Sequence, residues 1–304
     1  MGSVLGNRSM ADILKVIIIV VIVIILMVFI ESYREFQSFR IRRYTINDIN
    51  IPKSFDGYRI AVLGDLHNSS YGEDNQKLFE ALDQLAPDAV CIAGDMVLCR
   101  QRAYTANIKT ADFITKLCSR FDVYYGIGNH EKGLMDGYDN VGDNWDRYLE
   151  RLPKDIKLLS NKHIELKKEN DNIYIYGLDI ERSFYKRIKD IPMGVDYLEE
   201  KLGKKKEGYS ILLAHNPDYF DDYVSWGANL VISGHIHGGI VKLPFLGGVI
   251  SPKLRIFPKY DYGLFKKDDK YMIITGGLGA HFPKIRVNNK PELLEITLKT
   301  GENI

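Results

Sequence analysis

The longest apolar stretch of the chain is residues 13–30, which are almost wholly aliphatic, with Lys15 as the only charged residue. As a helix rising 1.5 Å per residue, this stretch is about 27 Å long, close to the hydrocarbon thickness of a bilayer. It has no polar face, which argues against a helix buried in a protein core. No small-x-small cleavage pattern follows it, which argues against a signal peptide. We therefore predict an uncleaved membrane anchor.

The rest of the chain divides around this anchor. Residues 1–12 are predicted to be an N-terminal tail, residues 31–50 a polar and basic juxtamembrane linker, and residues 51–304 one large domain. Only Arg8 and Lys15 stand at or before the start of the anchor, whereas several arginines follow it, at positions 34, 40, 42 and 43. The positive-inside rule therefore favours a single-pass protein of the cell membrane with its large domain in the cytoplasm, although large domains can override the rule.

Five short apolar runs in the large domain stop at side chains that can bind metals. They occupy residues 58–65, 89–95, 123–129, 210–215 and 230–235. Between the first three runs, residues 74–85 and 105–120 carry apolar side chains at the helical period. Alternating strands and helices predict βαβ units around a largely parallel, buried sheet.

Each of these five runs ends in Asp, Asn or His, and open α/β sheets bind their ligands beyond the carboxyl ends of the strands. A buried carboxylate or imidazole must be paired or must bind a metal. The closing pair His235 and His237 alone would more often be solvated or hydrogen-bonded. Five such ends together are poorly explained by separate structural roles. The candidate ligands are Asp65, His67, Asp95, Asn129, His215, His235 and His237.

Seven donors are too many for one tetrahedral ion, but they suit two ions that share a carboxylate and activate a water between them. Oxygen and imidazole donors without thiolate fit Mn²⁺, Fe or Zn²⁺. His130 is placed to protonate a leaving group, and Glu131 either orients it or is merely solvated. His163 and His281 lie outside these motifs and are interpreted as surface or core histidines, although His281 could line the site.

The order of these motifs resembles that of the calcineurin-like metallophosphoesterases. The matching motifs are Asp65-x-His67, Gly94-Asp95, Gly128-Asn129-His130-Glu131, His215 and Gly234-His235-x-His237. The resemblance extends from about residue 58 to the C-terminus, and stretches such as PDAVCIAGD are similar to the membrane-anchored bacterial branch. It implies an α/β fold, a four-layer α/β/β/α sandwich of two mixed sheets. Strand-like runs at residues 173–176, 271–275 and 293–298 independently favour a second, partly antiparallel sheet.

The resemblance also implies a division of the ligands. One ion would take Asp65, His67, Asp95 and His237, and the other would take Asp95, Asn129, His215 and His235, so that Asp95 bridges them. His130 would be the catalytic histidine. The implied activity is hydrolysis of phosphoester bonds by a two-metal-activated hydroxide, with a phosphodiesterase or pyrophosphohydrolase favoured over a monoesterase.

Composition narrows the alternatives. The chain has 41 Lys and Arg against 40 Asp and Glu in 304 residues. With no basic excess we expect no nucleic-acid partner, which argues against a nuclease of the same fold. The three cysteines form no disulfide framework. An anchor makes a lipid-linked phosphate a candidate substrate, although it fixes location rather than specificity. A catalytically silent metal-binding scaffold at the membrane stays an alternative, and no oligomeric state is predicted.

Overall fold

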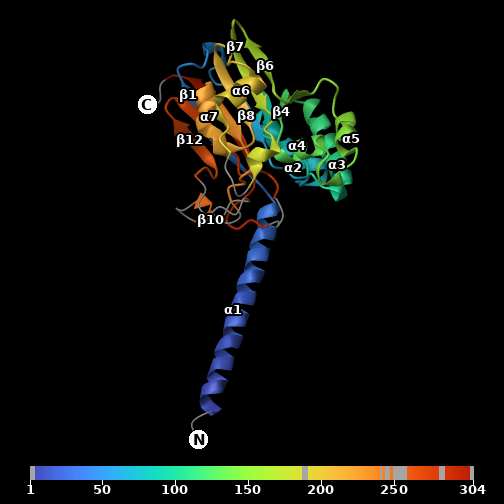
Figure 1. Ribbon diagram of the computed structural model, residues 1–304, viewed down its shortest axis with the longest axis vertical. Helices are drawn as coiled ribbons and strands as arrows, with labels where there is room; N and C mark the ends of the chain where they lie inside the picture. Colours follow the sequence, from blue (N-terminus) through green and yellow to red (C-terminus); the bar gives the residue numbers. More distant parts are fainter. Residues whose placement is uncertain are drawn as a thin grey trace.

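A computed structural model describes residues 4–186, 191–239, 242–243, 247–248, 259–280 and 285–301. The large domain consists of two six-stranded sheets that pack face to face, with helices on both outer faces (Figure 1). The predicted four-layer α/β/β/α sandwich of two mixed sheets is confirmed.

The first sheet has the strand order β1-β14-β2-β3-β4-β5. Its strands are β1 (Arg40–Asp48), β2 (Arg59–Leu63), β3 (Ala89–Ile92), β4 (Val123–Gly126), β5 (Lys157–Leu159) and β14 (Glu292–Thr300). Strands β2 to β5 run parallel, whereas β14 is antiparallel to β2 and parallel to β1. The three runs predicted between residues 58 and 129 are therefore β2, β3 and β4.

The second sheet has the strand order β12-β13-β9-β8-β7-β6. Its strands are β6 (Lys162–Lys168), β7 (Asp171–Leu178), β8 (Tyr209–Ala214), β9 (Leu230–Ser233), β12 (Gly263–Lys267) and β13 (Lys270–Ile274). The four central strands are parallel and both edge strands are antiparallel to their neighbours. The run at 293–298, which we grouped with this sheet, is β14 of the first. Strand β10 (Lys242–Leu243) pairs antiparallel with β11 (Gly247–Gly248).

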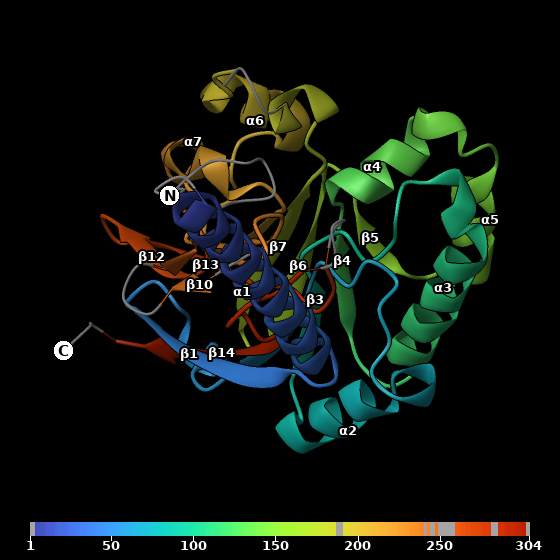
Figure 2. The same cartoon turned by 90° about the horizontal axis from the view of Figure 1, so that it is seen from below.

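Helices flank the two sheets, and Figure 2 shows α2 and α3 on one side and α6 and α7 on the other. They are α2 (Gln76–Leu85), α3 (Tyr104–Cys118), α4 (Asn129–Met135), α5 (Asn144–Arg151), α6 (Gly194–Leu202) and α7 (Phe220–Trp226). Short 3₁₀ turns lie at η1 (Lys53–Phe55), η2 (Glu73–Asn75), η3 (Gln101–Ala103), η4 (Tyr138–Asn140), η5 (Arg182–Tyr185) and η6 (Pro217–Tyr219). The helices predicted at 74–85 and 105–120 are α2 and α3, within two residues at each end.

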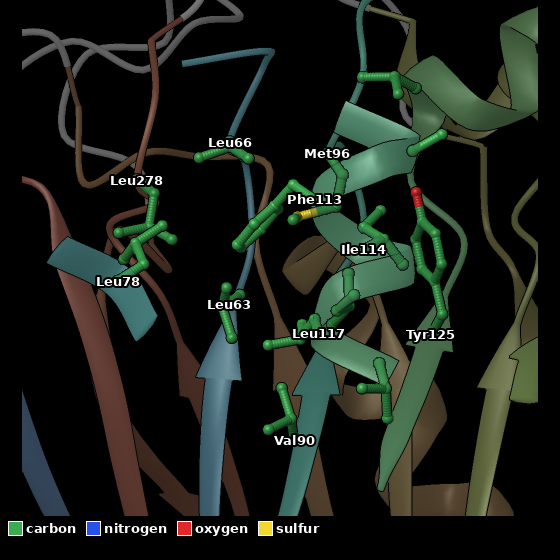
Figure 3. Packing of buried hydrophobic residues seen from close by; sticks show 14 of the residues in the cluster. Leu63, Leu66, Leu78, Val90, Met96, Phe113, Ile114, Leu117, Tyr125 and Leu278 are labelled. Atoms are coloured by element: carbon green, nitrogen blue, oxygen red, sulfur yellow. The ribbon is translucent and has the colours of Figure 1, made fainter. Parts of the chain in front are cut away.

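Three apolar layers hold the sandwich together, one between the sheets and one under each helical face. In the layer under α3, Leu63 and Val90 of the first sheet face Phe113 and Ile114 of the helix (Figure 3). Burial of apolar side chains on both faces of the central strands explains why β2, β3, β8 and β9 read as continuous apolar runs.

Helix α1 (Val4–Phe36) projects from the domain as one long rod (Figure 1). Residues 10–36 form a candidate membrane span by length and composition, and an 18-residue window within them has a mean hydropathy of 3.6. The region expected to be a linker, residues 31–50, differs from that expectation. Its first part continues α1 to Phe36, and residues 40–48 form β1, paired in register with β14. The arginines of β1 are accommodated because Arg40 and Arg42 both pair with the buried Glu292.

Candidate metal centre

The strands that carry the predicted donors end at the same edge of the sandwich. Their side chains form three overlapping groups, and within each group the ligand atoms lie within 4.8 Å of one another. These groups are Asp65, His67 and His237; His67, Asp95 and His130; and Asp95, His215 and His235. Residues as far apart in the chain as Asp65 and His237 are thus brought together, because the parallel strands of both sheets end at this edge.

The first half of the centre is built around Asp65. Its Oδ1 lies 3.3 Å from Nε2 of His237 and 3.8 Å from Nε2 of His67. The two Nε2 atoms lie 3.1 Å apart, and their rings stack at 20° with centroids separated by 4.9 Å. Two imidazole nitrogens and a carboxylate oxygen therefore converge on one point, which is the arrangement of ligands around a transition-metal ion.

Asp95 connects this half to the second. Its Oδ2 lies 3.1 Å from Nε2 of His215 and 3.9 Å from Nε2 of His67, so it faces both halves. Nδ1 of His215 lies 2.6 Å from the carbonyl oxygen of Ala93, and a proton on that nitrogen directs the Nε2 lone pair into the site. Asn129 adds a buried amide oxygen that has no hydrogen-bond partner among the described residues. An amide oxygen in this state can serve as a ligand to a cation.

The electrostatics of the buried Asp and His side chains, in the absence of metal, are those expected of a site that binds cations. Burial raises the pKa of Asp65 to about 7, and the neighbouring Asp95 carboxylate acts in the same direction. Burial would also raise the pKa of Asp95, but the surrounding histidines, His215 first, hold it well below its usual range. Burial opposes protonation of His215, yet Asp95 raises its pKa to about 10. Two buried carboxylates therefore compete for one cationic ring, and divalent ions would relieve that competition.

Several of the donor residues also have strained backbone angles. Five donors have left-handed φ angles, between 47° and 71°: Asp65, His67, Asp95, His235 and His237. Such angles cost free energy in residues other than glycine and persist where surrounding structure imposes them, often at functional sites. The packing is correspondingly tight, because a Cβ added to Gly128 would lie 2.3 Å from Oδ1 of Asp95.

Glu131 anchors the loop that carries Asp95. Its buried carboxylate accepts four hydrogen bonds from backbone N–H groups. The donors are Asp95 and Met96 at 2.8 Å each, Gly128 at 3.1 Å and Val97 at 3.4 Å. The hydroxyl of Tyr125 adds a fifth bond at 2.8 Å. Both sequence-based interpretations of Glu131 were therefore wrong: it is neither solvated nor bonded to His130. It positions Asp95 through the backbone.

His130 is fixed from both of its ends. Its backbone N–H donates to Oδ1 of Asp95 at 2.7 Å, and its Nδ1 accepts the N–H of Cys99 at 2.8 Å. An Nδ1 that accepts a hydrogen bond leaves the proton of the neutral ring on Nε2. The ring meets that of His67 edge to face, with centroids 4.9 Å apart. His130 therefore presents an N–H donor beside the donor cluster. No sequence pattern reveals the contribution of Cys99, because it comes from a main-chain group.

A second support was also absent from the sequence prediction. Arg286 is 1 % exposed, and its guanidinium donates to the carbonyl oxygens of Gly276, Gly277 and Gly279. Gly277 packs so closely on Asp65 that an added Cβ would lie 2.6 Å from the Cβ of that residue. Thus a buried arginine shapes the loop that supports the first half of the centre. Of the two remaining histidines, His163 lies exposed on β6, and His281 is outside the described residues.

This fold and this set of donors are those of a hydrolase domain whose Asp and His side chains could hold divalent metal ions. The model of the calcineurin-like phosphoesterase family matches residues 58–239, and the chain belongs to that family. It therefore hydrolyses phosphoester bonds, and the family depends on two metal ions.

Among its relatives is the uncharacterized metallophosphoesterase YkuE of Bacillus subtilis, 27% identical over 273 residues that cover 88% of each chain. The UDP-2,3-diacylglucosamine pyrophosphatase LpxG of Chlamydia muridarum is 25% identical and covers 81% of this chain and 86% of its own. A solved dimetal phosphatase from Danio rerio superposes with a TM-score of 0.42 at 13% identity, covering 80% of this chain and 99% of its own.

Proposed function

We propose that the chain is a membrane-anchored, two-metal phosphoesterase that cleaves phosphodiester or pyrophosphate bonds of a lipid-linked substrate. The observation that carries the proposal is the convergence of all three groups of donors at one edge of the sandwich. Every predicted donor that reaches this edge is buried or half-buried. A catalytically silent scaffold would have no need of a histidine placed, like His130, with a donor N–H beside the ligands.

The two ions would be held by overlapping sets of residues. Asp65, His67, Asp95 and His237 would bind one ion, and Asp95, Asn129, His215 and His235 would bind the other. Asp95 would be shared, in keeping with the position of its Oδ2 between His67 and His215. When bound, the ions supply an activated water and positive charge for the phosphoryl oxygens. Oxygen and imidazole donors suit Mn²⁺, Fe or Zn²⁺.

His130 would act on the leaving group. With Nδ1 held by the N–H of Cys99, the neutral ring carries its proton on Nε2, and this N–H would donate to the oxygen that gains negative charge as the phosphorus–oxygen bond breaks. Donation from a fixed ring costs no reorganisation during the reaction, which is why a preorganised donor stabilises the transition state. Glu131 and Cys99 would serve this step indirectly, by fixing the loops that carry Asp95 and His130.

Two features support a lipid-linked substrate at the membrane. Helix α1 is long and apolar enough to span a bilayer, and its last turn contacts the domain through Ser32, whose Oγ accepts the N–H of Arg286. A relative that aligns with most of the chain is named for the pyrophosphate of an acylated sugar nucleotide. The excess of arginine after the apolar stretch favours a domain on the cytoplasmic face, by the positive-inside rule.

The test uses the full-length protein in detergent, reconstituted with Mn²⁺, Zn²⁺ or Fe²⁺. We expect hydrolysis of bis-p-nitrophenyl phosphate to exceed that of p-nitrophenyl phosphate. Asp95→Ala and His130→Ala should each lower kcat by roughly 10²-fold or more, as expected for losing a shared ligand or a preorganised donor. Asp83→Ala and His163→Ala, on exposed residues, are the matched controls. Equal inactivity of wild type and variants with metal bound would favour the scaffold.

A further inference from the structure

Arg182, in η5 after β7, has no anionic partner among the residues that the structure describes. Its guanidinium stacks on the ring of Tyr138, 3.2 Å from the centroid. Its Nη1 is buried, and among the described residues it has no hydrogen-bond partner. Buried guanidinium donors are normally bonded, so an open one calls for an explanation. The nearby Lys132 behaves in the ordinary way, since it pairs with Asp136 at 3.2 Å and Asp179 at 3.5 Å.

The open guanidinium lies close to His130. A Cβ built on Gly133 of α4 would be 3.8 Å from Nη1 of Arg182 and 2.7 Å from Sγ of Cys99. Gly133 is three residues after His130, and residues three apart share one face of a helix, about one turn or 5 Å along the axis. Cys99 also donates its N–H to Nδ1 of His130. Arg182 therefore stands about one helical turn beyond the donor assigned to the leaving group.

A neighbouring buried hydroxyl points to the same region. Tyr185, at the other end of η5, packs its ring edge to face on His235 with centroids 4.9 Å apart. Its hydroxyl is buried and has no hydrogen-bond partner among the described residues. The turn η5 thus places two open donors, one cationic and one neutral, along the flank of the metal centre. Donors without acceptors fit a ligand that brings oxygens.

Resting on the function proposed above, we propose that Arg182 binds a second phosphate on the leaving-group side, so that the substrate class is pyrophosphate diesters. In the reaction, a water oxygen bonds to the phosphorus at the metal centre and the bond from that phosphorus to the bridging oxygen breaks. The bridging oxygen keeps the electron pair and departs with the second phosphate. The water loses its proton to solvent, and two phosphate monoesters result.

Charge explains why this substrate needs an arginine. The departing phosphate gains negative charge, which is spread over several of its oxygen atoms. A planar guanidinium can donate hydrogen bonds to two of these oxygens at once. The Tyr138 ring stacks on the guanidinium and orients it, and a contact with the face of the group does not use the N–H donors at its edge. A simple diester with an alcohol leaving group has no anion at this position, and its leaving oxygen depends on His130 instead.

The experiment compares two substrate types on the full-length, Mn²⁺-loaded protein in detergent. Bis-p-nitrophenyl phosphate carries one phosphate, whereas UDP-glucose, ADP-ribose and CDP-diacylglycerol carry a pyrophosphate diester. We expect Arg182→Gln to lower kcat/KM for the best pyrophosphate substrate 10- to 100-fold more than for the one-phosphate ester. Arg182→Lys should recover part of that difference. Arg151→Gln, on a surface arginine paired with Asp112, is the matched control.

Three results would overturn the proposal. Equal falls in kcat/KM on both substrate types would give Arg182 a structural role only, and unchanged kcat/KM values on both would remove it from the site. A wild-type enzyme that cleaves bis-p-nitrophenyl phosphate but none of the three pyrophosphates would refute the substrate class while leaving the two-metal function intact. Inactivity of the metal-loaded wild type on every ester would instead count against the proposed function itself.

Discussion

Replacing Glu131 by Gln tests whether this buried carboxylate holds the metal centre together. One carboxylate oxygen accepts the N–H groups of Asp95 and Gly128, and the other accepts those of Met96 and Val97 and the Tyr125 hydroxyl. A glutamine has one acceptor oxygen, so whichever way the amide turns, two backbone donors face an NH₂ group. Each orphaned buried donor costs about 1–3 kcal/mol. We therefore expect Glu131→Gln to destabilise the folded domain by roughly 4 kcal/mol.

The assay is urea unfolding of the full-length chain in detergent, followed by circular dichroism, together with titration of Mn²⁺ into the metal-free protein. We expect a large fall in the unfolding midpoint and weaker Mn²⁺ binding, because the Asp95 loop loses its support. Glu150→Gln removes an exposed carboxylate from α5 and should change stability by no more than about 0.5 kcal/mol. A loss below about 1 kcal/mol with unchanged Mn²⁺ affinity would refute this reasoning.

Three further predictions follow from the same contacts. Saturating the protein with Mn²⁺ at 100 times Kd should stabilise it by about 2.7 kcal/mol for each ion bound, and EDTA should reverse the rise in Tm. An identical Tm with EDTA would contradict metal binding to the fold. A chain that begins at Tyr44 lacks about half of β1 and the two arginines, Arg40 and Arg42, that pair with Glu292. Its Tm should be lower than that of a chain that begins at Gln37. Equal Tm values would show that this part of β1 contributes nothing to stability. Gly277→Ala places a Cβ 2.6 Å from the Cβ of Asp65 at a φ of +73°, and it should weaken Mn²⁺ binding measured by isothermal titration calorimetry. Gly137→Ala is the control, because Gly137 has a left-handed φ of +64° but open space around it, so Mn²⁺ binding should not change. Equal effects of the two variants would exclude packing on Asp65 as the cause.

The sequence predicted strands and site residues correctly where an unbroken apolar run ends in a polar residue that can bind a metal. Strands β2, β3, β4, β8 and β9 were predictable because their residues are buried on both faces, which produces unbroken apolar runs. The polar residue that ends each run was conspicuous for the same reason. Since parallel strands end at one edge, their order along the chain was enough to predict that Asp65, Asp95 and His215 would meet.

Strand β1 was missed because nothing in its local sequence distinguishes it from a solvated linker. Its sequence, RIRRYTIND, carries three arginines, and most of its residues are half-buried or exposed. What makes it a strand is its register with β14, about 250 residues away, and a buried carboxylate in Glu292 that neutralises Arg40 and Arg42. Long-range pairing of this kind overrides local propensity and leaves no periodic signal.

The contacts around Arg286 show a further limit of reading the site from donors alone. A buried arginine looks like a surface residue in a sequence, because its partners here are carbonyl oxygens that every residue carries. Its backbone N–H reaches Ser32 at the end of α1, and its guanidinium shapes the loop under Asp65. The last turn of the apolar helix is therefore connected to the metal centre through two layers of contact. A continuous helix followed closely by a paired strand leaves little freedom between them, so for a chain anchored by α1 the distance of the site from the bilayer is set by the fold rather than by a flexible tether.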